Sequence, residues 1–96
     1  MRYSFHPRAA EELYDAVERY EACHPGLGMD FAEEIYATIG RIAQFPNAWL
    51  ADSTNTRRCL VNRFPYGVVF QVKEQDMRII AIANLHRRPG YWRERL

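Results

Sequence analysis

The spacing of apolar residues changes along the first half of the chain, and each change marks the boundary of a predicted element. Residues 1–5 alternate between apolar and polar, which predicts a short strand. From Pro7 the apolar spacing becomes helical and charged residues fill the opposite side, until the breakers of residues 24–26 end the helix. A second amphipathic run covers residues 27–45 and stops at Pro46. Because the connection is short, we expect an antiparallel helical hairpin.

The second half of the chain carries strand patterns. Residues 47–56 are predicted to form a loop, and strand-like runs follow at residues 58–63, 66–73 and 77–85. The connections between these runs have hairpin length, which favours antiparallel neighbours. The order β-α-α-β-β-β predicts a single α+β domain over residues 1–96, with a helical hairpin packed on one face of an antiparallel sheet.

The last predicted strand is apolar on both faces, which is typical of a central strand. Alternation places on one face Ile79, Ala81, Ala83 and Leu85, and on the other Ile80 and Ile82. The second face turns polar at its end, at Asn84 and His86. We therefore expect the first face to meet the helices, and Asn84 and His86 to point toward an open face.

The composition fits one packed domain and excludes several protein classes. Hydrophobic residues make up 48% of the 96 residues and aromatic residues 14%, which is enough for a core. No apolar run approaches the ~20 residues of a membrane helix, and no secretory signal is recognisable. Two cysteines, Cys23 and Cys59, are too few for a disulfide scaffold. We expect a cytoplasmic protein with reduced thiols and no membrane partner.

The near-neutral net charge hides two halves of opposite sign. Residues 1–56 hold four arginines against nine carboxylates, a net −5, whereas residues 57–96 hold nine basic residues against three acidic ones, a net +6. All but one of the thirteen cations are arginines, and the exception is Lys73. Because a guanidinium binds carboxylates and phosphates in bidentate geometry, the basic half predicts an anionic partner, either nucleic acid or an acidic protein segment.

The densest group of candidate binding residues follows the last strand. Arginine, histidine, tyrosine and tryptophan together are typical of surfaces that bind nucleic acid or protein. The candidate target-binding residues are Arg58, Arg63, His86, Arg87, Arg88, Tyr91 and Trp92. A structural role is the alternative, in which Trp92 caps the core. The two consecutive arginines would then pair with helix carboxylates such as Glu11 or Glu34.

No pattern in the sequence supports a metal site, a cofactor or a nucleophile. His6 and His24 lie far apart, without further ligands at metal-site spacing. Ser53 and Cys59 have no companion histidine at a recognisable motif distance. The acidic helix residues are expected to form a solvated face; they are Glu11, Glu12, Glu33 and Glu34. We therefore expect no metal and no cofactor.

Short motifs follow one another in a characteristic order along nearly the whole chain. They are His6-Pro7-Arg8-Ala9, Phe45-Pro46, Arg57-Arg58, Phe64-Pro65-Tyr66 and His86-Arg87-Arg88-Pro89-Gly90-Tyr91-Trp92. In this order the chain resembles the RelE/ParE superfamily of toxins from bacterial type II toxin–antitoxin modules. It is most similar to the ParE-like branch, often called plasmid stabilisation proteins. The resemblance implies the fold predicted above.

The resemblance also implies a partner, a cognate antitoxin whose C-terminal segment wraps the toxin and neutralises it. Such segments commonly combine an amphipathic helix with an extended piece, and both fit a helical hairpin beside a basic rim. We expect the antitoxin segment to be anionic where it meets Arg58, Arg63 and Arg87.

Two targets are implied, because the superfamily divides. ParE-like members poison DNA gyrase and are not regarded as nucleases, whereas RelE-like members cleave mRNA on the ribosome without metal. The ribonucleases often carry lysines or a glutamate in the loop before the second strand. Here residues 47–56 contain no lysine, and Asp52 is the only charge. This departure favours a gyrase inhibitor that performs no chemistry of its own, so no catalytic residue is assigned.

A ribonuclease and a non-toxic binding module remain as alternatives. A ribonuclease would use His86, Arg88 and Tyr91 as acid, phosphate clamp and base around the 2′-OH, with Arg58 beside them. A non-toxic member of the family would serve only as a protein-binding module.

Overall fold

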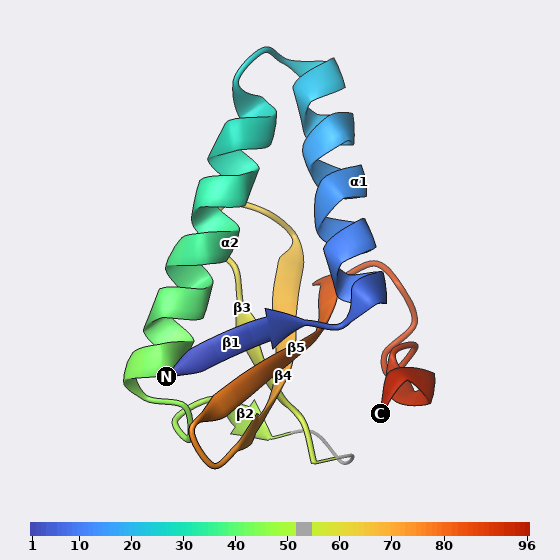
Figure 1. Cartoon of the computed structure of the whole chain (residues 1–96). Coiled ribbons are helices and arrows are strands. Elements are labelled where there is room, and N and C mark those ends of the chain that lie inside the picture. Colours follow the sequence, from blue (N-terminus) through green and yellow to red (C-terminus); the bar gives the residue numbers. More distant parts are fainter. Residues whose placement is uncertain (52–54) are drawn as a thin grey trace.

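Figure 1 shows the computed structural model of the chain, which describes residues 1–51 and 55–96. Two long helices form a hairpin whose tip extends beyond the sheet, and a C-terminal segment folds back beside the start of the first helix. The elements are β1 (Arg2–Phe5), α1 (Pro7–Cys23), α2 (Leu27–Gln44), β2 (Leu50–Ala51), β3 (Arg57–Leu60), β4 (Tyr66–Lys73), β5 (Asp76–Asn84) and a 3₁₀ turn, η1 (Arg93–Arg95).

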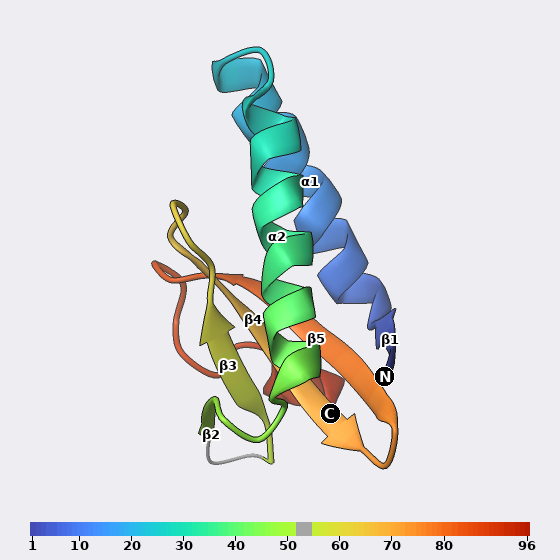
Figure 2. The ribbon, with the colours of Figure 1, turned by 90° about the vertical axis from the view of Figure 1, so that its left-hand side faces the viewer.

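The sheet has the strand order β1-β5-β4-β3-β2 and lies against the hairpin on one face (Figure 2). The predicted α+β class, the β-α-α-β-β-β order and the hairpin are confirmed. The expectation of an antiparallel sheet holds for β2 to β5, but β1 runs parallel to β5, so the sheet is mixed. The helical hairpin separates β1 from the other strands along the chain, so no turn dictates its direction.

The segment predicted as a loop, residues 47–56, contains the two-residue strand β2, which pairs with Arg57 and Arg58. Asp52 and Ser53 lie outside the described residues. The following strand is shorter than predicted, because β3 ends at Leu60 and Arg63 takes a left-handed backbone conformation with φ 72°.

The hairpin holds together through a close helix contact at its tip. The Glu21 carboxylate accepts hydrogen bonds from the backbone N–H groups of Gly26 and Gly28 at 3.0–3.1 Å, which satisfies two backbone donors at the start of α2. A Cβ atom on Gly28 would lie 2.6 Å from the carbonyl oxygen of Val17, so only glycine allows this approach.

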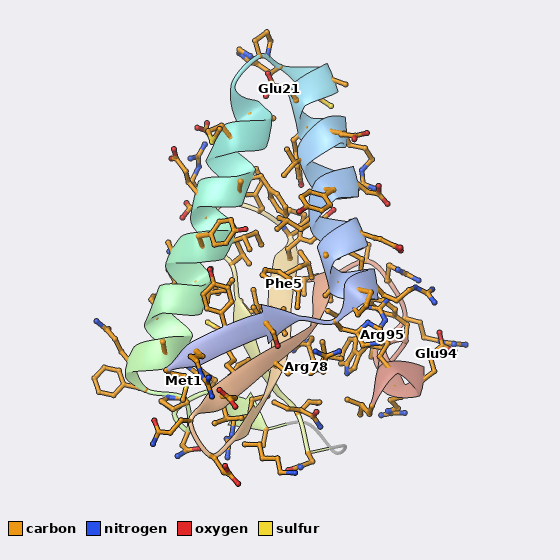
Figure 3. The ribbon with its side chains drawn as sticks, viewed as in Figure 1. Met1, Phe5, Glu21, Arg78, Glu94 and Arg95 are labelled. Atoms are coloured by element: carbon orange, nitrogen blue, oxygen red, sulfur yellow. The ribbon has the colours of Figure 1, made fainter. Side chains whose placement is uncertain are left out.

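The main core lies between the hairpin and the sheet. Phe5 points toward the space between the helices and packs against this core (Figure 3). Its centre is a group of rings at centroid distances of 4.8–6.3 Å, formed by Tyr20, Phe31, Phe64 and Tyr66. A second, smaller core covers the opposite face of the sheet; it consists of Val69, Ile80, Ala81, Ala83 and Trp92.

A β-bulge in β5 decides which side chains meet the helices. Phe70 of β4 pairs with Ile79 and Val69 pairs with Ala81, so Ile80 is an extra residue in the ladder. The expected facing is therefore right for Ile79 and Ile80 and wrong beyond them: Ile82 lies in the main core. Ala81 and Ala83 lie in the second core, and Leu85 is exposed rather than turned to the helices.

Candidate functional site

The backbone groups at the edge of β5 have different hydrogen-bond partners beyond the point where β1 ends. The backbone N–H of His6 donates to the Ile79 carbonyl at 2.8 Å, and there the ladder with β1 stops. Beyond this point the edge is satisfied by side chains: the Ile82 N–H donates to Glu12 Oε1 at 3.0 Å, and the Ile80 carbonyl accepts from Arg95 Nη1 at 3.0 Å. A helix residue and a C-terminal residue thus take the place of a strand.

Glu12 is the centre of this arrangement. The Arg95 guanidinium donates from Nη1 and Nη2 to the two carboxylate oxygens, each at 2.9 Å, and the Tyr91 hydroxyl donates to Oε2 at 2.6 Å. The Arg95 side chain is 4% exposed and that of Glu12 is 16% exposed. The Arg95 side chain extends from the C-terminal segment toward the first turns of α1 (Figure 3). Glu12 therefore does not belong to a solvated face, contrary to the expectation from the sequence.

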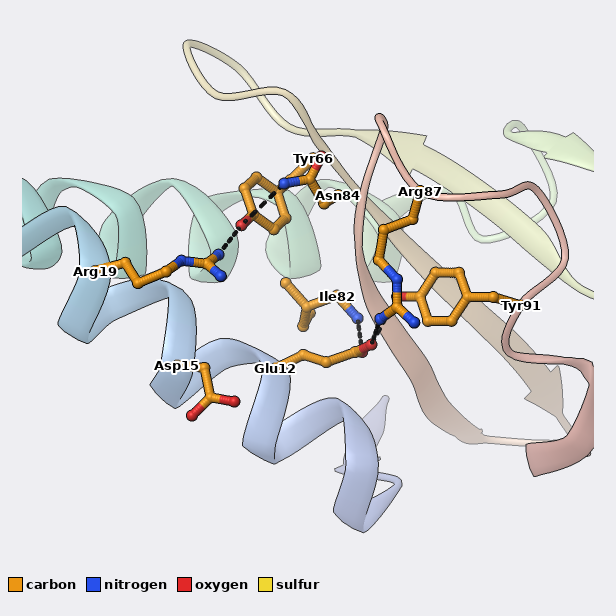
Figure 4. Close-up of a pocket in the computed structure, with 8 residues that line it drawn as sticks. All are labelled: Glu12, Asp15, Arg19, Tyr66, Ile82, Asn84, Arg87 and Tyr91. Atoms are coloured by element: carbon orange, nitrogen blue, oxygen red, sulfur yellow. Dashed lines mark hydrogen bonds and ion pairs between the residues drawn. The ribbon is translucent and has the colours of Figure 1, made fainter.

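A pocket of about 280 Å³ opens beside Glu12 (Figure 4). Its lining residues come from α1, β4, β5 and the C-terminal segment: Glu12, Asp15, Arg19, Tyr66, Ile82, Asn84, Arg87 and Tyr91. Arg19 donates to the Tyr66 hydroxyl at 2.6 Å, and the Asn84 amide lies 3.5 Å from the same oxygen. Asn84 thus points to the helix side, not to the open face, because the bulge reverses the alternation.

The structure brings four of the candidate target-binding residues to one exposed border. The Leu85 N–H donates to the Pro65 carbonyl at 2.9 Å, which joins the turn after β3 to the turn after β5. We call the exposed arginines and histidine of these turns the basic rim: Arg63, His86, Arg87 and Arg88.

Members of the basic rim differ in how their side chains are held. Arg63 pairs with Asp30 at 3.5 Å, and both side chains are about half exposed. Arg87 stacks on the Tyr91 ring at 3.8 Å and lies 3.5 Å from Glu12 Oε2. The side chains of His86 and Arg88 make no hydrogen bond or ion pair with any residue in the described ranges. Arg88 therefore offers an uncommitted guanidinium.

Arg58 and Trp92 lie outside this border. Arg58 is half-buried on β3, where its aliphatic part crosses Gly67, and it lines a separate recess with Arg41 and Trp49. Trp92 is 4% exposed and packs in the second core. The expectation that the indole is displayed beside the arginines is not met; of the two alternatives, capping of the core is the one observed.

Tyr91 is half-buried and its hydroxyl is committed to Glu12. Burial raises the pKa of Tyr91 well above its usual range, and the hydrogen bond and charge of Glu12 raise it further, against the arginines beside it. A general base works best with a pKa near the operating pH, so this phenol is unsuited to that role.

Several residues of the site escaped prediction from the sequence. Glu12, Arg19 and Arg95 are charged residues in an acidic helix and a basic tail, and nothing in their spacing distinguishes them from solvated neighbours. Tyr66 stands out in the sequence only as part of the Phe64-Pro65-Tyr66 motif, and the role of Asn84 depends on the bulge. A sequence signal was present only in the opposite charges of the two halves.

Neither a metal site nor a membrane span is found in the described part of the chain. Residues 1–51 and 55–96 contain no group of three or more histidine, cysteine or acidic side chains placed to hold a metal ion. None of the described helices is long and apolar enough to cross a bilayer.

Comparison with known proteins gives a consistent result. Residues 3–89 match the family model described as the ParE toxin of the type II toxin–antitoxin system parDE. Among solved structures, a chain of the chromosomal ParDE toxin–antitoxin system from P. aeruginosa superposes with a TM-score of 0.77. That match has 19% identity and covers 90% of this chain and 97% of the other, which shows a shared fold. No curated protein matches by sequence.

Proposed function

The chain belongs to the ParE toxin family of type II toxin–antitoxin systems, and from this premise we propose that it inhibits DNA gyrase through the basic rim. As a member of the family it is the toxin component of such a module, and an antitoxin is its partner. Gyrase as the target, and the cytoplasm as the place of action, are the parts proposed here.

The state of Tyr91 favours a binding toxin over a ribonuclease. In the ribonuclease alternative Tyr91 is the base, but its hydroxyl donates to Glu12 at 2.6 Å, and burial raises the pKa of Tyr91. Meanwhile Arg88 and His86 are exposed and have no side-chain partner in the described ranges. This combination supports recognition by charge and hydrogen bonding, without bond cleavage.

We expect the antitoxin to cover the rim with acidic side chains. Arg63 pairs with Asp30 where both side chains are about half exposed, and such a pair contributes about 0–1 kcal/mol. Arg63 can therefore exchange Asp30 for a carboxylate of an anionic, amphipathic C-terminal segment at little cost. The Arg87 side chain is 56% exposed, so it can keep Glu12 and donate its remaining N–H groups to a second carboxylate. Arg58, which has no ion pair with a described residue, offers a further contact.

The test uses purified toxin, DNA gyrase and plasmid DNA. We expect wild-type toxin to block supercoiling or to trap cleaved plasmid, and Arg88→Ala to weaken this effect by about tenfold or more, since a charged hydrogen-bonded contact is worth about 1.5–3 kcal/mol. Arg2→Ala is the matched control. It removes the same charge at the opposite end of β5, where Arg2 pairs with Asp76 on the surface.

Three results would count against the proposal. If a folded Arg88→Ala variant inhibits gyrase as strongly as the wild type, the basic rim does not take part in inhibition. If gyrase is unaffected and messages are cleaved in a translating extract, the chain is a ribonuclease and not a gyrase inhibitor. If the toxin binds an antitoxin but neither inhibits gyrase nor cleaves messages, the chain is a non-toxic binding module.

A further inference from the structure

We propose that Glu12 of α1 is a positioning residue that sets the geometry of the C-terminal part of the basic rim (His86, Arg87 and Arg88), by fixing the C-terminal segment (residues 85–96) against the edge of β5 beyond β1. What the rim binds rests on the function proposed above. The positioning itself follows from contacts within the chain.

The first step is the edge of β5. Past Ile79 no described strand pairs with β5 on the β1 side, and the Ile82 N–H is satisfied by Glu12 Oε1 at 3.0 Å. A buried N–H without a partner costs about 1–3 kcal/mol, so the carboxylate holds α1 and β5 in one register.

The second step is the far end of the segment. Arg95 is anchored on the same carboxylate through both Nη atoms and on the Ile80 carbonyl through Nη1. Its side chain is almost fully buried, so the guanidinium has given up its water and depends on these partners. Glu12 therefore ties the last turn of the chain to the middle of the sheet.

The third step connects the anchor to the rim. The Tyr91 hydroxyl donates to Glu12 Oε2, and the ring of Tyr91 is the surface on which the Arg87 guanidinium stacks at 3.8 Å. Arg87 also reaches the same carboxylate oxygen at 3.5 Å. The Tyr91 N–H donates to the Arg88 carbonyl at 3.3 Å, which closes the turn from Arg88 to Tyr91, and the Arg87 N–H donates to the Asn84 carbonyl at 3.1 Å, which closes the turn before it. The orientation of Arg87, and the placement of the segment that carries His86 and Arg88, thus depend on one side chain outside the rim.

Trp92 cannot replace this anchor. Its indole packs on the apolar side chains of the second core and has no hydrogen-bond partner in the described residues. Apolar packing holds the segment onto the sheet but does not direct it, since the hydrophobic effect is non-directional. The hydrogen bonds of Glu12 supply the direction.

The experiment compares Glu12→Gln with Glu11→Gln. The two residues are neighbours on α1 and the change is the same, but Glu11 is exposed and makes no hydrogen bond or ion pair with a described residue. Amide hydrogen exchange reports the anchor directly. In Glu12→Gln we expect the amides of Ile82, Arg95 and Leu96 to exchange about tenfold faster or more, with Val68 in the core unchanged. In Glu11→Gln all four are expected to keep wild-type rates.

Growth arrest on induction gives the second readout. We expect that about tenfold more Glu12→Gln protein than wild-type protein is needed for the same growth arrest, and that Glu11→Gln arrests growth at the wild-type level. Wild-type exchange and wild-type arrest in Glu12→Gln would overturn the proposal. So would a loosened segment with unchanged arrest, because the geometry of the rim would then not depend on the anchor.

A second variant guards against a general loss of folding. Arg95→Gln leaves the Ile82–Glu12 hydrogen bond and removes the tie to the chain end, so we expect faster exchange at residues 95 and 96 with reduced arrest. If both variants exchange faster at Val68 as well, Glu12 is a general stability residue and the proposal falls. If gyrase is unaffected by wild-type toxin while both readouts behave as expected, the positioning stands and the gyrase target falls.

Discussion

Tyr91 and Trp92 are adjacent aromatic residues with opposite roles. Tyr91 lies at the border between a buried carboxylate and an exposed arginine, and its hydroxyl and ring face serve both neighbours. Trp92 faces the sheet and is buried. The sequence identified this pair as candidate binding residues but did not show which of the two is buried. Two neighbouring residues in a turn can point in any of several directions.

Tyr91 is expected to make the fold sensitive to alkali. Its pKa in the folded state is raised, first by burial and then by Glu12, so its neutral form contributes stability that is lost as pH rises above the ordinary value near 10. Urea unfolding at increasing pH measures this. Above that pH the free energy of unfolding should fall less steeply for Tyr91→Phe than for the wild type. An equally steep fall would mean that Tyr91 does not carry the pH dependence.

Trp92→Ala is expected to reduce the free energy of unfolding by about 3–5 kcal/mol, since it removes the largest side chain of the second core. Leu96→Ala, at a residue that is 49% exposed in the same segment, is the control and should stay within about 0.5 kcal/mol. Chemical denaturation checks both. A small loss for Trp92→Ala would place the indole on the surface, where it would again be a candidate for target contact.

Among the elements, the helices were predictable and the details of the sheet were not. The hairpin follows from helical spacing and a short breaker, both of which are local. The facing of β5 beyond Ile80 and the direction of β1 depend on pairing between distant segments. A single bulge shifts each later side chain to the other face, so alternation alone assigned Ala81 and Ile82 wrongly.

The tip of the hairpin is expected to reject any side chain at Gly28. Gly28→Ala places a Cβ 2.6 Å from the Val17 carbonyl oxygen and should cost about 1–3 kcal/mol of stability, despite the better helix propensity of alanine. Gly40 lies in the same helix with open space around it, so Gly40→Ala should stabilise by about 0.5–1 kcal/mol. Thermal unfolding of the two variants should shift in opposite directions; equal shifts would contradict the close contact.

The start of α1 is expected to weaken in mild acid. His6 Nδ1 accepts the Arg8 N–H at 3.0 Å and must be neutral to do so. Desolvation, followed by the charges of Arg78 and Arg95, lowers the pKa of His6. Its contribution to stability is therefore present above the ordinary pKa of about 6.5 and is lost as pH falls below it toward the lowered value.

His6→Asn tests this contribution, because asparagine caps a helix without titrating in this range. The difference in free energy of unfolding between about pH 7 and pH 5.5 should be smaller in the variant than in the wild type. An unchanged difference would mean that other groups carry the dependence.

Across the whole molecule, the unequal charge halves explain how the site is built. The acidic first half supplies Glu12 and Asp30, and the basic second half supplies their partners Arg95 and Arg63. The sequence predicted a basic border and the structure gathers four of its candidates there. The buried pair at Glu12 was not predictable, because its partners are separated by more than eighty residues in the chain.

Induction of the toxin in growing cells, with DNA, RNA and protein synthesis followed separately, tests the proposed function most directly. For a gyrase inhibitor that acts through the basic rim, DNA synthesis should stop and breaks should accumulate while protein synthesis continues, and Arg88→Ala should relieve the arrest. Loss of protein synthesis with cleaved messages, while DNA synthesis continues, would contradict it.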